Sequence, residues 1–257
     1  MLRSRIIPCL LVHKKGLIKT TSFSDPKYVG DPLNAVKIFN EKEVDELMVL
    51  DIDATVEGRG PDFNMIRNIA IECRMPFCYG GGVTSVEQAK KLIGLGAEKI
   101  ALSSAAVENI HILESIGNAV GIQSVVVVLD AKKAGLFGTY EIFTHNGKKS
   151  SGLKVKDFVQ QLDSIGVGEI VINSIERDGR MEGYDYTLID MVRDHTDVLV
   201  TVLGGAGSVG DLQKTVDKYK IIGVAAGSLF VFKGKFRAVL INYPSKEELN
   251  KIFNPQV

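Results

Sequence analysis

The chain contains two similar halves, and this internal repeat limits its fold more than any other feature. Residues 81–87 (GGVTSVE) resemble residues 204–210 (GGAGSVG), which lie 123 positions later (204 − 81) in a chain of 257 residues. Residues 45–51 are echoed by residues 168–173 at nearly the same spacing. Solenoid repeats recur every ~20–50 residues, so this longer spacing indicates duplication of a multi-element unit within one closed fold.

Short apolar runs alternate with stretches of helical periodicity along the chain. The candidate strands are 5–12, 46–52, 76–80, 99–102, 124–129, 169–173, 198–203 and 223–226. Apolar residues have helical spacing in 86–95 and 153–165, and Ser85 is a candidate N-cap. Eight such strands predict an α/β fold, the (β/α)8 TIM barrel, as one domain over 1–257. Its half-barrels would cover about 1–121 and 122–245, with a small hairpin at 137–144 and a C-terminal helix at 245–253.

Composition excludes several classes of function. The chain has 31 Lys and Arg against 31 Asp and Glu, so no net charge favours nucleic acid or an acidic membrane surface. Cys9, Cys73 and Cys78 lack the spacing of a metal site or a disulfide framework, which predicts reduced, buried thiols and no metal. No apolar run is long enough to span a bilayer, and the first residues do not resemble a signal peptide. These features predict a cytoplasmic protein.

Glycine pairs directly after two strands predict two phosphate-binding cradles. In a TIM barrel the chemistry lies where strands end, and glycine lets backbone N–H groups approach an anion closely. The first cradle combines Gly82 with Ser103 and Ser104, and the second combines Gly205 with Gly227 and Ser228. Asp178 and Gly179, after the sixth strand, are assigned to the same phosphate-binding set. Each pair alone is also explained by a tight turn, but their recurrence at matched positions favours a substrate with a phosphate at each end.

Polar residues at the same strand ends are candidates for acid–base chemistry and substrate binding. Asp130 closes an apolar run, and such surroundings raise a carboxylate pKa towards the range useful for proton transfer. Asp51 and Asp53 end the second strand on one side, although one of them could simply hydrogen-bond the next loop. Lys19, in a predicted loop after the first strand, is either a substrate ligand or an exposed surface lysine. Asn173 ends the sixth strand and is a further candidate substrate ligand.

Several short motifs together carry a family resemblance: RIIPCL (5–10), DIDAT (51–55), GGGV (80–83), DAK (130–132), RDG (177–179) and GGAG (204–207). The chain resembles the HisF family, the cyclase subunits of imidazole glycerol phosphate synthase, over essentially its whole length. The resemblance implies conversion of the doubly phosphorylated ribonucleotide PRFAR to imidazole glycerol phosphate and AICAR, in histidine biosynthesis and without a cofactor. It also implies a heterodimer with a HisH-type glutaminase, which supplies ammonia at the barrel's N-terminal face.

By this resemblance, four residues match the charged ring that gates ammonia entry in the family: Arg5, Glu46, Lys99 and Glu169. Each begins a predicted strand, so the four are expected to meet at the face opposite the glycine loops. Without the resemblance, an ion-pair layer that stabilises the barrel floor explains them equally well.

The chain departs from the family at a catalytic position. HisF cyclases use one aspartate on the first strand and one on the fifth; here the fifth-strand residue is Asp130, but the first-strand residue is Leu11. Leucine cannot transfer a proton, and loss of such a group lowers a rate by about 10²–10⁴. Asn173 also stands where Thr is common.

Three alternatives to the cyclase follow. The chain is similar to a HisF-like branch in which the barrel is thought to deliver ammonia to a sugar amidotransferase in surface-polysaccharide (O-antigen) biosynthesis. A structural scaffold with an unused pocket is a second alternative. The sister isomerase HisA is a third, disfavoured by the charged ring because an isomerase needs no ammonia.

Overall fold

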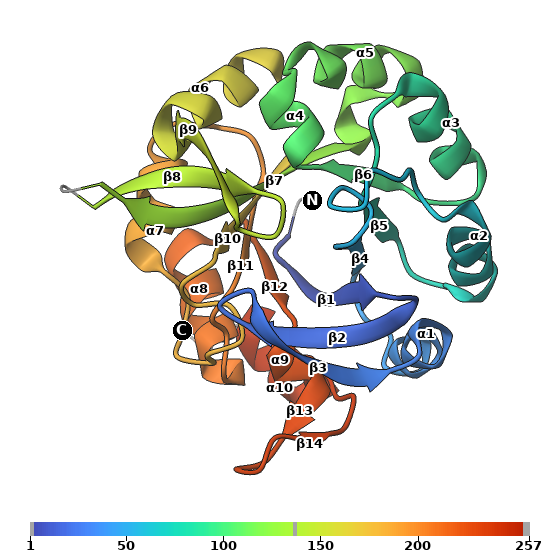
Figure 1. Cartoon of the computed structure of the whole chain (residues 1–257). Helices are drawn as coiled ribbons and strands as arrows, with labels where there is room; N and C mark the ends of the chain where they lie inside the picture. The colour runs from blue at the N-terminus through green and yellow to red at the C-terminus, as the bar shows by residue number, and fades with distance from the viewer. Residues whose placement is uncertain (1–2, 136–137, 254–257) are drawn as a thin grey trace.

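Eight parallel strands form a closed barrel at the centre of the molecule, and helices surround it (Figure 1). The computed structural model describes residues 3–135 and 138–253. The barrel strands are β1 (Arg5–His13), β4 (Leu47–Asp51), β5 (Phe77–Gly80), β6 (Lys99–Leu102), β7 (Val125–Ala134), β10 (Glu169–Ser174), β11 (Val200–Leu203) and β12 (Gly223–Ala226). β1 pairs with β4 and β12, and β7 with β6 and β10, which closes the ring. The predicted (β/α)8 barrel is confirmed.

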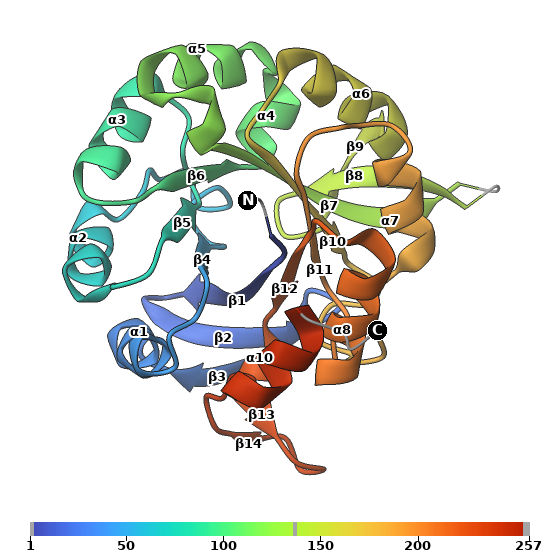
Figure 2. The same cartoon turned by 180° about the vertical axis from the view of Figure 1, so that it is seen from behind.

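The helices lie outside the strands, as the view from behind also shows (Figure 2). They are α1 (Pro32–Glu41), α2 (Phe63–Glu72), α3 (Val86–Gly94), α4 (Ser104–Glu108), α5 (His111–Val120), α6 (Val155–Ile165), α7 (Tyr186–Arg193), α8 (Val209–Tyr219), α9 (Ser228–Val231) and α10 (Lys246–Phe253), with a 3-10 turn at Ile122–Ser124. The repeat recurs in their caps, because Ser85 begins α3 and Ser208 begins α8 with the same reciprocal capping box. Corresponding sequences in the two halves therefore adopt the same local structure.

Two antiparallel extensions rise from the barrel strands. β2 (Gly16–Thr21) folds back on β1, and β3 (Ser24–Gly30) pairs with β2. β7 continues past the barrel and pairs with β8 (Thr139–Thr144), which pairs with β9 (Lys149–Lys154). The insertion predicted at 137–144 is thus a larger three-stranded ribbon, and position 137 lies outside the described residues. A short pair, β13 (Phe232–Lys233) and β14 (Ala238–Val239), follows α9.

Apolar side chains fill the barrel interior between its two ends. The interior cluster consists of Ile7, Cys9, Met48, Cys78, Ala101, Val126, Val128, Val171, Leu203 and Ala225. A separate, larger core packs the outer faces of the strands against the helices. The three thiols are free. Cys9 and Cys78 are buried as predicted, but Cys73 is only half-buried because it lies just beyond the end of α2.

Candidate active site

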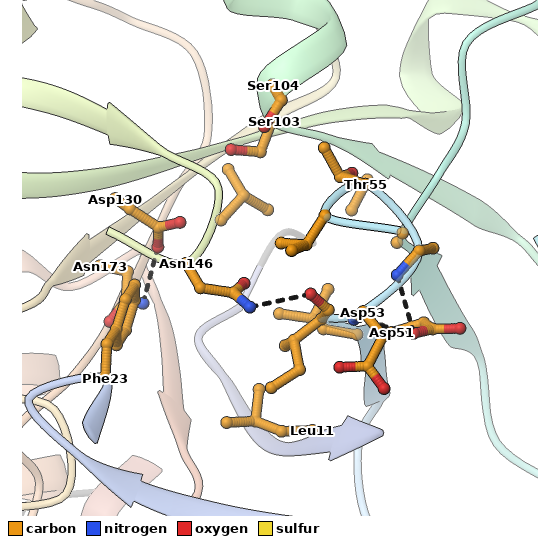
Figure 3. A pocket seen from close by; sticks show the side chains of 18 of the residues that line it. Leu11, Phe23, Asp51, Asp53, Thr55, Ser103, Ser104, Asp130, Asn146 and Asn173 are labelled. Carbon is orange, nitrogen blue, oxygen red and sulfur yellow. Dashed lines mark hydrogen bonds between the residues drawn. The ribbon is translucent and has the colours of Figure 1, made fainter. Parts of the chain in front are cut away.

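A cavity of about 840 Å³ occupies the carboxyl-terminal mouth of the barrel. Its walls include both predicted cradles, Leu11 and Asp130. Figure 3 shows Ser103 and Ser104 on one wall, Asp130 and Asn173 on a second, and Leu11 on a third. Residues distant in sequence therefore face one shared space of the size that ordinarily holds a small-molecule ligand.

The first cradle has the backbone geometry that its glycines predict. Gly82 has φ of +68°, and a Cβ atom there would collide with the carbonyl oxygen of Arg59. Ser103 precedes α4 without making a side-chain cap hydrogen bond. Since no side chain caps this helix, its first N–H groups remain available to an anion in the cavity.

The second cradle repeats this geometry and adds a cation. Gly205 has φ of +118°, and Gly227 begins α9 without a side-chain cap. The ammonium of Lys19 lies beside Gly227, where a Cβ atom would collide with Lys19 Nζ. Ser228 is buried at the start of the same helix. Backbone N–H groups and one ammonium group therefore meet at this end of the cavity.

Replacing Gly82 with Ala is expected to weaken binding of inorganic phosphate and to lower the free energy of unfolding by about 1–3 kcal/mol. The new Cβ would have to occupy both a strained φ and the space of the Arg59 carbonyl. Equilibrium dialysis with phosphate and urea denaturation measure the two effects. Gly94→Ala is the matched control, because a Cβ there would meet no described atom within 4 Å beyond its chain neighbours and its own helix backbone. Unchanged phosphate affinity in Gly82→Ala would contradict the cradle.

Asp130 lies at the mouth on β7, as predicted, and its side chain is hydrogen-bonded to Asn173. The Nδ2 of Asn173 donates a hydrogen bond of 2.9 Å to its Oδ1, and the two residues are directly paired between β7 and β10. Burial raises the pKa of Asp130 to about 7, although the hydrogen bond from Asn173 acts in the opposite direction. Asp130 can therefore exchange a proton near neutral pH.

Leu11 gives the facing wall no acid–base group. It is paired with Leu50 on β4 and with Ile18 on β2, and its side chain lines the cavity. The register of β1 thus presents an apolar side chain at the mouth, as its place in the sequence predicts.

Asp51 and Asp53 are both engaged by the protein. Asp51 accepts two hydrogen bonds from Arg59, at 2.8 and 3.0 Å, and two more from the backbone of the following loop. Asp53 accepts from His13 Nδ1 at 2.7 Å and from the backbone N–H of Lys14 at 2.7 Å. These contacts hold the loop that covers Gly82. Direct binding of substrate by Asp51 stays a prediction, and no local pattern indicates the role of Arg59.

Lys19 is not in a loop and is not exposed, which corrects two parts of the sequence interpretation. It lies on β2, where the chain reverses onto β1, with 5% of its surface exposed. Its Nζ donates to the carbonyl oxygen of Cys9 at 2.6 Å, and burial lowers its pKa.

Asp178 accepts a 2.6 Å hydrogen bond from Thr20, and burial raises the pKa of Asp178. With Gly179, which is packed against the Thr20 carbonyl, it joins β2 to the second cradle.

The four charged residues predicted at the barrel floor form one ion-pair cluster. Lys99 Nζ lies 2.8 Å from both Glu46 and Glu169, and Arg5 contacts the same two carboxylates, at 2.9 Å for Glu169. Thr201, which sequence reasoning missed, donates a further hydrogen bond to Glu169. Burial alone would raise the pKa of Glu169, but Arg5 and Lys99 outweigh it and lower that pKa.

Residues 5–237 match the family model described as "Histidine biosynthesis protein". The chain belongs to this family.

Among the described residues, no group of three or more His, Cys, Asp or Glu side chains is arranged to hold a metal ion. No helix of residues 3–135 or 138–253 is both long and apolar enough to cross a membrane.

Relatives within the histidine biosynthesis family match the chain over nearly its whole length. It is 55% identical to "Putative imidazole glycerol phosphate synthase subunit hisF3" of Vibrio vulnificus, over 98% of this chain and 96% of the relative. It is 52% identical to "Putative imidazole glycerol phosphate synthase subunit HisF" of Leptospira interrogans, over 98% and 100%. The imidazole glycerol phosphate synthase subunit HisF of Dictyoglomus thermophilum is 37% identical, over 90% and 91%. These names fit the HisF resemblance and a divergent branch within it.

Proposed function

We propose that this chain is a HisF-type synthase subunit that uses ammonia from a HisH-type glutaminase to convert PRFAR to imidazole glycerol phosphate and AICAR. The observation that carries the proposal is the shared cavity, in which Asp130 lies together with two separate phosphate cradles. A substrate with a phosphate at each end fits such a cavity. The names of the HisF relatives support the same reaction.

In this proposal each group of residues has one task. The two cradles bind the terminal phosphates and so place the reacting centre over the barrel axis, where Asp130 exchanges a proton with it. The ring of Arg5, Glu46, Lys99 and Glu169 lies at the opposite end, where ammonia would enter from the glutaminase. Apolar side chains between the two ends keep bulk water from the path.

Leu11 favours a second candidate function. Because this side chain cannot replace an aspartate, a barrel that retains the ring but transfers no proton at this wall suits ammonia delivery to another enzyme. The acceptor would be a sugar amidotransferase of surface-polysaccharide biosynthesis, as the HisF-like branch implies. This candidate predicts that the chain activates its glutaminase while it forms negligible imidazole glycerol phosphate.

Turnover of PRFAR with excess ammonium salt at mildly alkaline pH distinguishes the two candidates. Clear product formation by the parent would support the cyclase. A silent parent with an active Leu11→Asp variant, whose rate would rise by about 10²–10⁴, would support ammonia delivery by a barrel that lost its own chemistry. Leu11→Asn is the matched control, because it adds a polar group that cannot transfer a proton. Inactivity of all three would contradict PRFAR as the substrate.

Replacing Lys99 with Ala is expected to uncouple the use of glutamine from the use of free ammonia. The change removes the cation that bridges Glu46 and Glu169 at the floor. In the complex with the glutaminase, the ratio of product formed to glutamine hydrolysed should fall, while turnover with ammonium salts should stay near that of the parent. An unchanged ratio would mean that the ring only stabilises the barrel.

A further inference from the structure

Asn173 holds Asp130 with one end of its amide. The residue lies on β10 directly opposite Asp130 on β7, and its Nδ2 donates to Asp130 Oδ1 at 2.9 Å. Only 5% of Asn173 is exposed, and Asp130 beside it is half-buried. A hydrogen bond given to a carboxylate favours its ionised form and fixes its orientation.

The other end of the same amide has no partner. Asn173 Oδ1 is one of two buried side-chain polar atoms without a hydrogen bond among the described residues; the second, Tyr79 Oη, does not line the cavity. An unpartnered buried acceptor costs about 1–3 kcal/mol, which a bound donor would offset. A Cβ atom at position 204 would lie 2.7 Å from Oδ1, so Gly204 allows the amide its position.

The position of Asn173 connects it to the barrel floor. Alternate side chains of a strand face the same side, so Glu169, Val171 and Asn173 form one inward row on β10. Glu169 belongs to the charged ring, Val171 to the apolar interior cluster, and Asn173 lines the cavity. Because Oδ1 is itself buried, a small molecule that passes the ring along this row reaches it only when the Asn173 side chain shifts.

Three other acceptor groups near the mouth already receive hydrogen bonds. Both oxygens of Asp51 accept from Arg59, and Asp178 accepts from Thr20. The carbonyl of Cys9 accepts from the ammonium of Lys19. Asn173 Oδ1 differs from these three groups because it receives no hydrogen bond from the described residues.

We propose that Asn173 is a two-sided positioning and binding residue, which holds the Asp130 carboxylate through Nδ2 and receives an N–H group of ammonia at Oδ1. The ammonia half rests on the proposed function, because it assumes that ammonia enters the barrel. The Asp130 half does not. Bound in this way, ammonia lies on the Gly204 side of the Asn173 amide, and Nδ2 at the other end of that amide contacts the carboxylate that exchanges the proton.

Carbon-13 NMR of the Asp130 carboxyl tests both halves without any turnover. In Asn173→Leu the pKa of Asp130 is expected to rise, because the hydrogen bond that favours the ionised form is lost. Ammonium chloride should shift the Asp130 resonance in the parent, relative to sodium chloride at the same ionic strength, and not in the variant. Asn173→Ala removes the same atoms and adds none, so it replaces Asn173→Leu if the larger side chain prevents folding.

Asn146→Leu is the matched control for this titration. Asn146 also lines the cavity, but its Nδ2 donates to the Ile52 carbonyl at 3.0 Å rather than to Asp130 (Figure 3). The Asp130 titration should be the same in this variant as in the parent. An unchanged Asp130 pKa in both Asn173 variants would overturn the positioning half, and an ammonium effect that survives in them would overturn the binding half.

If the chain turns over PRFAR, steady-state kinetics provides a second test of the proposal. The KM for ammonium should rise about five- to tenfold in Asn173→Leu, while the affinity for inorganic phosphate stays within about twofold of the parent. An unchanged ammonium KM would count against the binding half. If the parent forms no product, the cyclase proposal fails, but the NMR titrations still decide the role of Asn173.

Discussion

Replacing Asp130 with Asn is expected to lower the rate of product formation from PRFAR and ammonium salt by about 10²–10⁴. The variant keeps the shape of the side chain but cannot accept or release a proton near pH 7. Asp130 is the carboxyl group at the cavity wall whose pKa burial raises to about 7, and Asn173 is its only side-chain hydrogen-bond partner among the described residues. Single-turnover measurements with saturating ammonium would isolate the chemical step.

The affinity for inorganic phosphate serves as the control, because the cradles do not include Asp130. It should be the same in Asp130→Asn as in the parent. A variant that retains both phosphate binding and the parent rate would show that another group transfers the proton, and the assignment of Asp130 would be wrong.

The same substitution is expected to change the pH dependence of stability. The pKa of Asp130 is about 7 in the folded protein and 3.8 in the ordinary exposed state, so the folded protein holds the proton more tightly. The free energy of unfolding contributed by this group is therefore greatest below pH about 4 and falls as the pH rises to about 7. Urea denaturation across this range should show the decline in the parent and a smaller one in Asp130→Asn. If Asp130 acts as a base, parent turnover should rise through pH about 7.

Replacing Glu169 with Ala is expected to lower the free energy of unfolding by about 3–5 kcal/mol. The Glu169 side chain is only 1% exposed and contacts Arg5 at 2.9 Å and Lys99 at 2.8 Å. Removal of this carboxylate leaves two partly buried cations to share Glu46 alone. Since the pKa of Glu169 lies below its usual range, the carboxylate is charged at neutral pH and its loss is a loss of charge pairing.

Urea denaturation at pH 7 measures this effect, and Glu57→Ala is the matched control. Glu57 also pairs with an arginine, at 2.6 Å, but its side chain is 52% exposed, so its removal should change the free energy of unfolding by about 1 kcal/mol or less. A loss of the same small size in Glu169→Ala would mean that water enters the floor and replaces the carboxylate.

Local patterns accounted for the barrel and for the places of its candidate functional residues. Apolar runs, glycines and caps depend on short-range geometry, and the predicted strands agree with β1, β4 and the others to within about two residues at their starts. The capping boxes at Ser85 and Ser208 and the positive φ of Gly82 and Gly205 are likewise readable from the residues themselves. Charges at the starts of strands indicated the floor cluster, because every barrel strand points the same way.

Contacts between segments that are distant in the chain could not be predicted from the sequence. Lys19 looked like a loop residue, because the chain gives no sign that β2 folds back on β1 and carries the ammonium to the Cys9 carbonyl. Arg59 on Asp51 and Thr201 on Glu169 depend in the same way on how loops and neighbouring strands pack. Such contacts depend on register and on side-chain direction, which no local pattern encodes.

The sequence by itself determined the barrel, the glycine-rich loops after its strands, the charges at its floor and the apolar residue at position 11. Each of these follows from residue type and from position along a strand. Only the tertiary structure decided that Asn173 holds Asp130 and keeps an unpartnered oxygen beside it. The physical reason is that this arrangement depends on the pairing of β7 with β10, which joins residues 43 positions apart in the chain.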